Sequence, residues 1–279
     1  MNNYRDSCLV EQRHFKVSKP TKFKDAVTWE NQVMAFQGTD AGIGTTFLSF
    51  ATAWSAARIG KQRVAYLSVG RDPRKLWRYL GMRRARVRMK RKQGWTYAQY
   101  DPITASGVLQ SSSTTLLPGL TIMSGGFSGA KWDSSSAKAL LAFLKANFHC
   151  CIIDLHGDLT LSIAQDIGVG ADACVNVVTP LSFKQANPCI TERLIRASGR
   201  TDNGLDVLVN QADSGQMTAA AAGEMPAVAS KKLNVLGSVC WSRQVAEFLG
   251  QGKLQQLLQT NTSIGKTART LLSACLNRS

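Results

Sequence analysis

The segment QVMAFQGTDAGIGTTFLSFATAWSAARIG, residues 32–60, contains a short apolar run, a glycine-rich turn and a long helical pattern, in that order. Residues 32–36 are expected to form a strand and residues 45–59 a helix. Gly60 would end that helix, because glycine is the usual residue just past a helix terminus. Another apolar run follows at residues 63–67. A strand, a turn, a helix and a second strand form a βαβ unit, which implies a parallel sheet.

The same alternation of short apolar runs and helical patterns continues along the chain. Further strands are expected at residues 120–123, 150–154, 173–178, 205–210 and 235–239, and helices at residues 135–147, 158–168, 182–197, 215–229, 243–258 and 264–277. We therefore predict an α/β fold, in which a doubly wound, mostly parallel sheet is flanked by helices. Residues 32–279 are expected to form this single domain, and residues 1–31 an N-terminal extension outside it.

The composition places limits on the class of protein. Of the 279 residues 44% are apolar, which is enough for a buried core and argues against wholesale disorder. No apolar run approaches the ~18 residues that a membrane span needs, and the first residues lack the apolar segment of a secretory signal. The seven cysteines have no CxxC spacing and the three histidines form no ligand cluster. We therefore expect reduced, buried thiols and a cytoplasmic protein.

The net charge of +16 predicts attraction to polyanions, either nucleic acid or an anionic membrane surface. The densest basic run is followed by aromatic residues, a combination that suits both nucleic-acid backbones and lipid headgroups. The basic side chains of this run, which are expected to contact DNA or membrane, are Arg83, Arg84, Arg86, Arg88, Lys90, Arg91 and Lys92, and the aromatic residues after it are Trp95, Tyr97 and Tyr100.

The glycine-rich turn that begins at Gly38 has the properties of an anion site. Backbone N–H groups of such a turn can point inward, and the helix that follows adds positive potential at its N-terminus. Gly42, Gly44, Thr45 and Thr46 are the residues expected to surround a phosphate through backbone and hydroxyl groups.

The sequence DAGIGTT, residues 40–46, resembles the deviant Walker A motif K-G-G-V-G-K-T of the ParA/MinD ATPases. Further segments resemble this family in the same order: residues 151–154 its Walker B strand, residues 175–180 the strand after switch II, residues 208–213 its N-R-x-D-like segment, and residues 235–253 its last strand and the helix that follows. The resemblance covers residues 32–277.

The resemblance implies a site for ATP and Mg²⁺. The residues that would bind the nucleotide are Gly38, Asp40, Ala41, Gly42, Ile43, Gly44, Thr45, Thr46 and Asn210. Thr46 and Asp154 would hold the metal, Asn210 would read the adenine base, and Asp72 would orient the attacking water.

Two positions of the phosphate loop depart from the family pattern. Asp40 and Thr45 stand where the family has its signature lysine and its Walker A lysine, and Asp72 aligns with the catalytic aspartate only after a small insertion. Lysines at the loop stabilise charge that develops in the transition state, so their loss predicts slow hydrolysis. Degenerate loops of this kind resemble those of the TadZ/CpaE pilus-localisation proteins.

Three functions follow as alternatives. The leading one is a ParA/MinD-like nucleotide switch or pseudo-ATPase that binds ATP weakly or not at all. It would form a homodimer and position a pilus or secretion complex or a DNA cargo, near the inner membrane or nucleoid. The second is a slow but genuine ATPase of plasmid or chromosome partition, in which Arg71 replaces the missing lysine. The third is a nucleotide-free interaction scaffold. The protein partner would belong to a pilus, secretion, conjugation or partition system.

Residues 264–277 carry an apolar stripe that permits two interpretations. Packing against the core is the commoner fate of such a stripe, whereas a resemblance to the last helix of MinD would make it a membrane-binding amphipathic helix. His156, which follows the Asp154 strand, is either an exposed loop residue or a sensor of the γ-phosphate.

Overall fold

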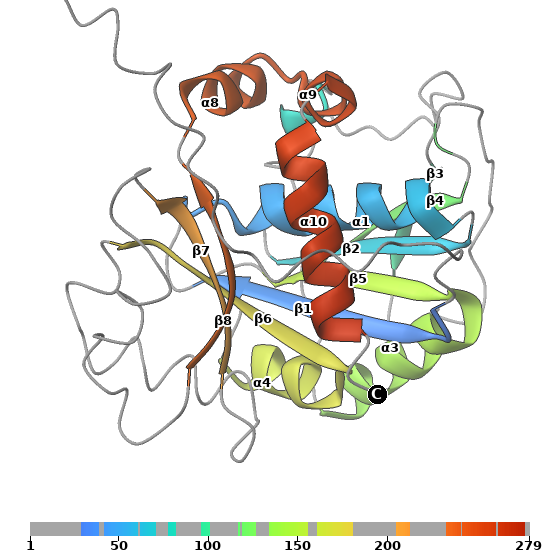
Figure 1. Cartoon of the computed structure of the whole chain (residues 1–279). Coiled ribbons are helices and arrows are strands. Elements are labelled where there is room, and N and C mark those ends of the chain that lie inside the picture. Colours follow the sequence, from blue (N-terminus) through green and yellow to red (C-terminus); the bar gives the residue numbers. More distant parts are fainter. Residues whose placement is uncertain are drawn as a thin grey trace, which may run out of the picture.

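The computed structural model of this 279-residue chain describes residues 29–38, 42–60, 62–70, 78–81, 96–100, 117, 119–126, 134–155, 161–180, 205–212, 233–240, 242–260 and 262–276. Its described strands form one eight-stranded sheet in the order β3-β4-β2-β5-β1-β6-β7-β8 (Figure 1). Neighbouring strands are parallel throughout this sheet. The strands are β1 (Gln32–Gly38), β2 (Val64–Gly70), β3 (Thr96–Tyr100), β4 (Leu120–Gly126), β5 (Cys150–Leu155), β6 (Ala173–Val178), β7 (Leu205–Ala212) and β8 (Leu233–Cys240).

Helices cover both faces of the sheet, as expected for a doubly wound fold. One face carries α1 (Thr45–Gly60), α8 (Arg243–Gly250), α9 (Leu254–Thr260) and α10 (Thr262–Leu276), and the other carries α3 (Ser134–Asn147) and α4 (Leu161–Gly170) (Figure 1). The predicted fold class is therefore confirmed. The alternation of the chain across the sheet brings the carboxyl ends of β1, β2 and β5 together at the start of α1.

The central strands are apolar because both of their faces are buried. In β1, Met34 and Phe36 join the core under α1, whereas Val33 and Ala35 join the core under α3 and α4. A strand buried on both faces reads as a continuous apolar run rather than as an alternating one. This is why the sequence pattern located β1, β5 and β6 closely.

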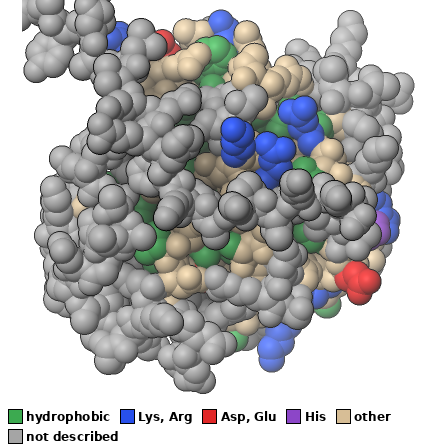
Figure 2. All heavy atoms as spheres, in the orientation of Figure 1, with side chains coloured by type: hydrophobic (Ala, Val, Ile, Leu, Met, Phe, Trp, Pro, Cys, Tyr) green, Lys and Arg blue, Asp and Glu red, His purple; other side chains and the backbone are tan. Residues whose placement is uncertain are grey.

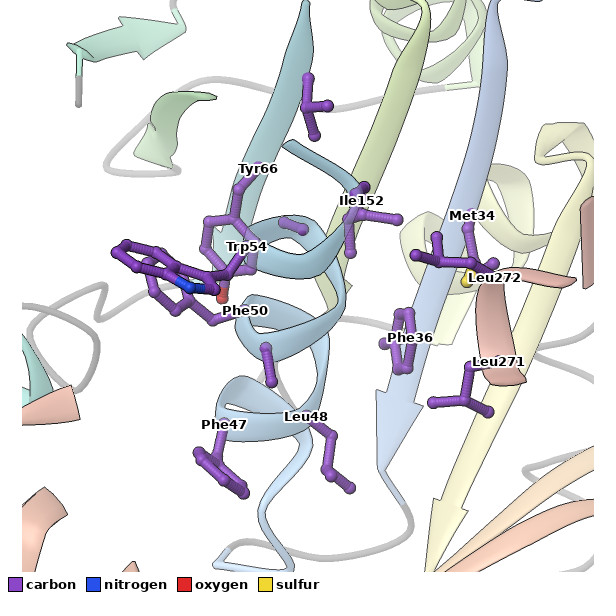
Figure 3. Close-up of a cluster of buried hydrophobic side chains, with 14 of the residues drawn as sticks. Met34, Phe36, Phe47, Leu48, Phe50, Trp54, Tyr66, Ile152, Leu271 and Leu272 are labelled. Carbon is purple, nitrogen blue, oxygen red and sulfur yellow. The ribbon is translucent and has the colours of Figure 1, made fainter. Parts of the chain in front are cut away.

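Helix α1 packs on the sheet over β2 and β5 and lies beside α10, which packs on the same face against β8. Every side chain from Phe47 to Ala57 is buried. Phe50 meets Tyr66 of β2 edge to face, with ring centroids 5.2 Å apart and an interplanar angle of 80°, and the Trp54 ring is also near Phe50, at 6.3 Å between centroids (Figure 3). Edge-to-face aromatic pairs add to the stability that burial alone provides. The start of α1 is thus held rigidly over β2 and β5.

The edge strand β3 was not predicted. Residues 96–100 were interpreted as aromatic neighbours of the basic run, but they pair with β4 as a parallel strand. Strand β3 has only five residues and no long apolar stretch, so its sequence signal is weak. Tyrosine and threonine nevertheless favour strands.

The single helix predicted at residues 243–258 was also wrong. Gly252 adopts a left-handed backbone, with φ of 70°, and separates α8 from α9. The N–H groups of Gly252 and Lys253 donate to the carbonyls of Leu249 and Phe248 at 3.1 and 2.9 Å. These two bonds form a Schellman motif, the usual glycine-based end of a helix.

The apolar stripe of α10 is part of the core, as the commoner of its two interpretations predicted. The stripe residues Ile264, Ala268, Leu271, Leu272 and Cys275 are all buried. They pack against α1 and β8, which places this stripe inside the molecule.

Several expectations concern residues outside the described ones, namely the helices at residues 182–197 and 215–229 and the extension before Trp29. Trp29, within the expected extension, is buried in the core, and its backbone N–H donates to Gln62 Oε1 at 3.2 Å. In the part of the chain that the structure describes, no helix is both long enough and apolar enough to span a membrane.

Candidate phosphate-binding site

The glycine turn lies between the carboxyl end of β1 and the first residue of α1, Thr45. Gly42 and Gly44 have φ of 86° and 91°, in the left-handed region that favours glycine. An added Cβ at Gly42 would meet nothing within 4 Å, so this part of the turn borders open space. Thr39, Asp40 and Ala41 lie outside the described residues, and the roles predicted for Asp40 and Ala41 stay predictions.

The end of β7 holds the turn through two side-chain amides. Asn210 Nδ2 donates to the carbonyl of Ile43 at 2.5 Å, and Gln211 Nε2 donates to the carbonyl of Gly42 at 3.3 Å. Asn210 is buried and also lies against Gly44, where an added Cβ would collide with its Nδ2. The structure therefore brings Asn210 to the turn, while its predicted contact with adenine stays a prediction.

These two hydrogen bonds determine which way the backbone of the turn faces. In a planar trans peptide the C=O and the following N–H point in opposite directions. With the carbonyls of Gly42 and Ile43 directed to β7, the N–H groups of Ile43 and Gly44 point away from β7. Successive N–H groups turned to one side at a helix N-terminus are an arrangement that binds anions.

Thr45, which stands where the Walker A lysine would be, folds back onto β1. An added Cβ at Gly38 would collide with Thr45 Oγ1 and would lie 2.8 Å from Ile43 Cδ1. The tight contact explains why residue 38 is a glycine. The residue at position 45 therefore supplies a short hydroxyl beside β1 and no positive charge.

Asp154 is fully buried at the end of β5, one strand away from the glycine turn. Its Oδ2 accepts a hydrogen bond from the Tyr66 hydroxyl at 3.0 Å. The same hydroxyl lies 3.5 Å from Ser49 Oγ, which donates to the carbonyl of Thr46 at 3.2 Å. A chain of polar groups thus connects Asp154 with the first turn of α1.

Burial and the nearby charge of Asp154 both favour the neutral form of Tyr66. Desolvation is the larger cause and the Asp154 carboxylate the next, and together they raise the pKa of Tyr66 well above its ordinary value. Desolvation also raises the pKa of Tyr79; Arg78 opposes this rise and Asp154 adds to it. The described segment 78–81 therefore lies within the electrostatic reach of Asp154.

The donor set at this place fits Mg²⁺. Among the described residues, no group of three or more His, Cys, Asp and Glu side chains could hold a metal ion by itself. Mg²⁺ is usually held by one or two carboxylates together with phosphates and water rather than by a protein cage. The Asp154 carboxylate and the Thr46 hydroxyl would hold the ion, whose chemistry is to neutralise phosphate charge.

Other predicted site residues lie outside the described ones. They are Asp72, Arg71, His156 and the basic residues of the run at 83–92. Their roles stay predictions.

Sequence reasoning missed Tyr66 and Gln211. A tyrosine in an apolar strand was a usable signal, because a buried phenol O–H needs a hydrogen-bond partner. Gln211 gave no comparable signal.

A parallel, doubly wound sheet with a glycine turn between β1 and α1 and a carboxylate at the end of β5 is the architecture of the P-loop NTPases. Among solved structures, MinD and ParA ATPases share the fold of this chain. MinD in the MinC:MinD cell division complex of Aquifex aeolicus has 18% sequence identity and a TM-score of 0.61, over 87% of this chain and 96% of that chain.

Two further structures share the fold. A ParA family ATPase from Chlorobium tepidum TLS has 13% identity and a TM-score of 0.61, over 86% of this chain and 98% of that one. A plasmid partition protein from Borrelia burgdorferi B31, bound to AMPPNP, has 11% identity and a TM-score of 0.60, over 89% and 99% of the two chains. No family model and no curated protein sequence matches this chain.

Proposed function

We propose that this protein is a ParA/MinD-like nucleotide switch that binds ATP with Mg²⁺ weakly, hydrolyses it slowly or not at all, and positions a partner. The observation that carries the proposal is the pair of amides from β7 that direct the carbonyls of Gly42 and Ile43 away from the turn. A loop with no ligand to bind would not need its N–H groups oriented by two side chains from a distant strand.

Weak binding follows from the charges of the loop. Thr45 contributes a hydroxyl where the related motif has a lysine, so backbone dipoles and Mg²⁺ have to balance the phosphate charge. Positive groups aimed at a transferring phosphoryl group typically contribute several kcal/mol to the transition state. The loss of such a group affects hydrolysis more than binding, and this favours a switch over a fast enzyme.

A basic surface supports contact with a polyanion. Figure 2 shows several Lys and Arg side chains close together on the face that α1 and α10 form in Figure 1. Arg58 of α1 and Lys266 and Arg269 of α10 are exposed, and neither helix contains an acidic residue. The run at residues 83–92 adds seven basic side chains to the molecule. DNA or an anionic membrane is the partner that this charge fits.

The solved structures with this fold support the parts of the proposal that concern the nucleotide, Mg²⁺ and a protein partner. One is a MinD in complex with MinC, one a MinD with Mg-ADP from Pyrococcus horikoshii, and one a partition protein with AMPPNP. By analogy, this chain would bind its nucleotide at the glycine turn, dimerise across it and engage a protein of a pilus, secretion, conjugation or partition system.

The test is calorimetric titration of the full chain with ATP and Mg²⁺. We expect weak binding by the wild type and at least about tenfold tighter binding by Thr45→Lys, because a loop lysine restores charge beside the phosphates. Thr270→Lys, the same change at an exposed position of α10, is the matched control for net charge. Equal effects of the two substitutions, or no binding by any variant, would reject the site.

Steady-state hydrolysis of ATP, measured with and without DNA or liposomes, separates the switch from a genuine ATPase. We expect turnover well below the ~1 to 1,000 s⁻¹ of typical enzymes under all three conditions. Turnover in that range would favour the ATPase alternative. Absence of nucleotide binding would favour the scaffold.

A further inference from the structure

Tyr66 is the residue of this site that no part of the proposed function yet uses. We infer that Tyr66 is a positioning residue for Asp154: its O–H holds one carboxylate oxygen so that the other is fixed for the Mg²⁺ at the start of α1. The inference rests on the proposed function, because it concerns the metal that would accompany the nucleotide.

The geometry of Tyr66 suits this role. Its ring is fully buried and fixed by the edge-to-face contact with Phe50, so the hydroxyl has a defined position (Figure 3). That hydroxyl donates to Asp154 Oδ2 at 3.0 Å and lies 3.5 Å from Ser49 Oγ. The carboxylate is therefore held from the core side of α1, between β2 and β5, by a group that cannot move without repacking.

The chemistry of the pair suits the positioning of a metal ligand. The Tyr66 hydroxyl donates to one oxygen of the Asp154 carboxyl group at 3.0 Å. Carboxylates that bind metals are themselves held by hydrogen bonds, and removal of such a partner typically lowers metal affinity about 10- to 100-fold. Tyr66 occupies the place of such a partner, 88 residues away from Asp154 in the chain.

Tyr79 provides a matched comparison. It is also a tyrosine within the electrostatic reach of Asp154, and it is half-buried rather than fully buried. Replacement of Tyr66 or Tyr79 by phenylalanine removes one hydroxyl and leaves the ring. Only the first change removes the hydrogen bond to Oδ2.

The experiment measures ADP binding by calorimetry, once with Mg²⁺ and once with EDTA, for the wild type, Tyr66→Phe and Tyr79→Phe. The readout is the ratio of the two affinities, because a loss of stability alone would not change this ratio. We expect Tyr66→Phe to lower the ratio about 10- to 100-fold while binding in EDTA is retained. Tyr79→Phe should leave the ratio as in the wild type. Urea unfolding of each variant confirms that the folded chain is being titrated.

The second arm uses Asp154→Asn. In that background Tyr66→Phe should have no further effect on the ratio, because the two residues act through the same carboxylate. Ser49→Ala, which removes the neighbour of the phenol, should lower the ratio in the same direction and by less, and it serves if Tyr66→Phe does not fold.

Two results would overturn the inference and separate it from the proposed function. In the first, the wild type binds nucleotide, and Tyr66→Phe has the same affinity ratio as the wild type or a higher one. This result would show that Tyr66 does not position Asp154, and the proposed function would stand. A wild type that binds no ADP with or without Mg²⁺ would reject both.

Discussion

The conformation of the glycine turn before α1 depends on which of its residues are glycine. Gly44 has φ of 91°, and an added Cβ would collide with the Asn210 amide that orients the loop. Gly42 has a similar φ of 86° but open space around it. The two positions therefore share the backbone requirement for glycine, and only Gly44 also has a steric one.

This pair allows the steric contribution to be measured. Gly42→Ala should lower the free energy of unfolding by about 1 to 2 kcal/mol, the usual cost of a left-handed backbone for a residue with a Cβ. Gly44→Ala should cost about 1 to 3 kcal/mol more, because the Asn210 side chain has to move and its hydrogen bond to Ile43 is lost. Urea denaturation of the two variants and the wild type measures the difference. Equal costs at the two positions would contradict the contact with Asn210.

Sequence reasoning selected those candidate residues that lie within short local motifs, and their roles stay predictions. The glycine turn was chosen from its residues, whereas Asp154 and Asn210 were chosen because their segments resemble motifs of the ParA/MinD ATPases. The hydrogen bonds of Tyr66 and Gln211 join residues 88 and 169 positions apart. Such contacts depend on strand order and on the height of each side chain above the sheet, and an apolar pattern specifies neither.

Among the elements, the turn between α8 and α9 does more than end a helix. Gly252 and Gly81 both have left-handed backbones, with φ of 70° and 74°, and their main chains touch. An added Cβ at Gly252 would lie 2.5 Å from the Cα of Gly81 and 2.9 Å from the carbonyl oxygen of Arg78. This contact fixes the segment that carries Tyr79 against the C-terminal helices.

Gly252→Ala is therefore expected to be costly. The substitution combines a strained φ with a backbone-to-backbone clash that no side-chain rotation can relieve, so we expect a loss of about 2 to 4 kcal/mol. Gly250→Ala is the control, because it lies two residues earlier at the end of α8, where an added Cβ meets nothing within 4 Å. The control should be neutral or up to about 1 kcal/mol stabilising. Thermal or urea unfolding distinguishes the two, and similar stabilities would exclude the contact between Gly81 and Gly252.

Elements were predictable where burial gives a regular pattern. The strands at the centre of the sheet and the helices α1, α3 and α10 were located from their apolar runs and stripes. The edge strand β3 was missed because five residues with little apolar content give a weak signal. The break at Gly252 was missed because the apolar pattern continues from α8 into α9, and only the glycine itself marks the end of the first helix.

For the molecule as a whole, the doubly wound architecture buries the central strands and the cysteines that they carry, as the sequence predicted. The alternation of strands and helices predicted a parallel sheet buried on both faces, and thiols within it. Cys150 and Cys151 are buried in β5, at the middle of the sheet. The apolar pattern does not specify which strands are neighbours in the sheet. Strand order emerges only when all the crossover connections are placed together.

Burial of these groups should make the fold less stable as the pH rises into the alkaline range. Desolvation raises the pKa of Cys150 from 9.0 to about 12, and it raises the pKa values of Cys151 and Tyr66 well above their ordinary values. The unfolded chain therefore loses these protons at lower pH than the folded chain does. The stabilisation is fully present below the unfolded-state pKa values and is lost as the pH rises through the folded ones.

The contribution of Cys150 can be isolated in the slope of stability against pH. Between pH 9 and about 12 the unfolded thiol is ionised and the folded one is not, so this group alone should remove about 1.4 kcal/mol per pH unit. Cys150→Ala should make the slope less steep by that amount, whatever its effect on stability at neutral pH. Cys240→Ala, at an exposed cysteine of β8, is the matched control and should keep the wild-type slope. Urea unfolding at pH 8, 9, 10 and 11 measures both slopes. Parallel slopes for Cys150→Ala and the wild type would mean that β5 opens to solvent before the molecule unfolds.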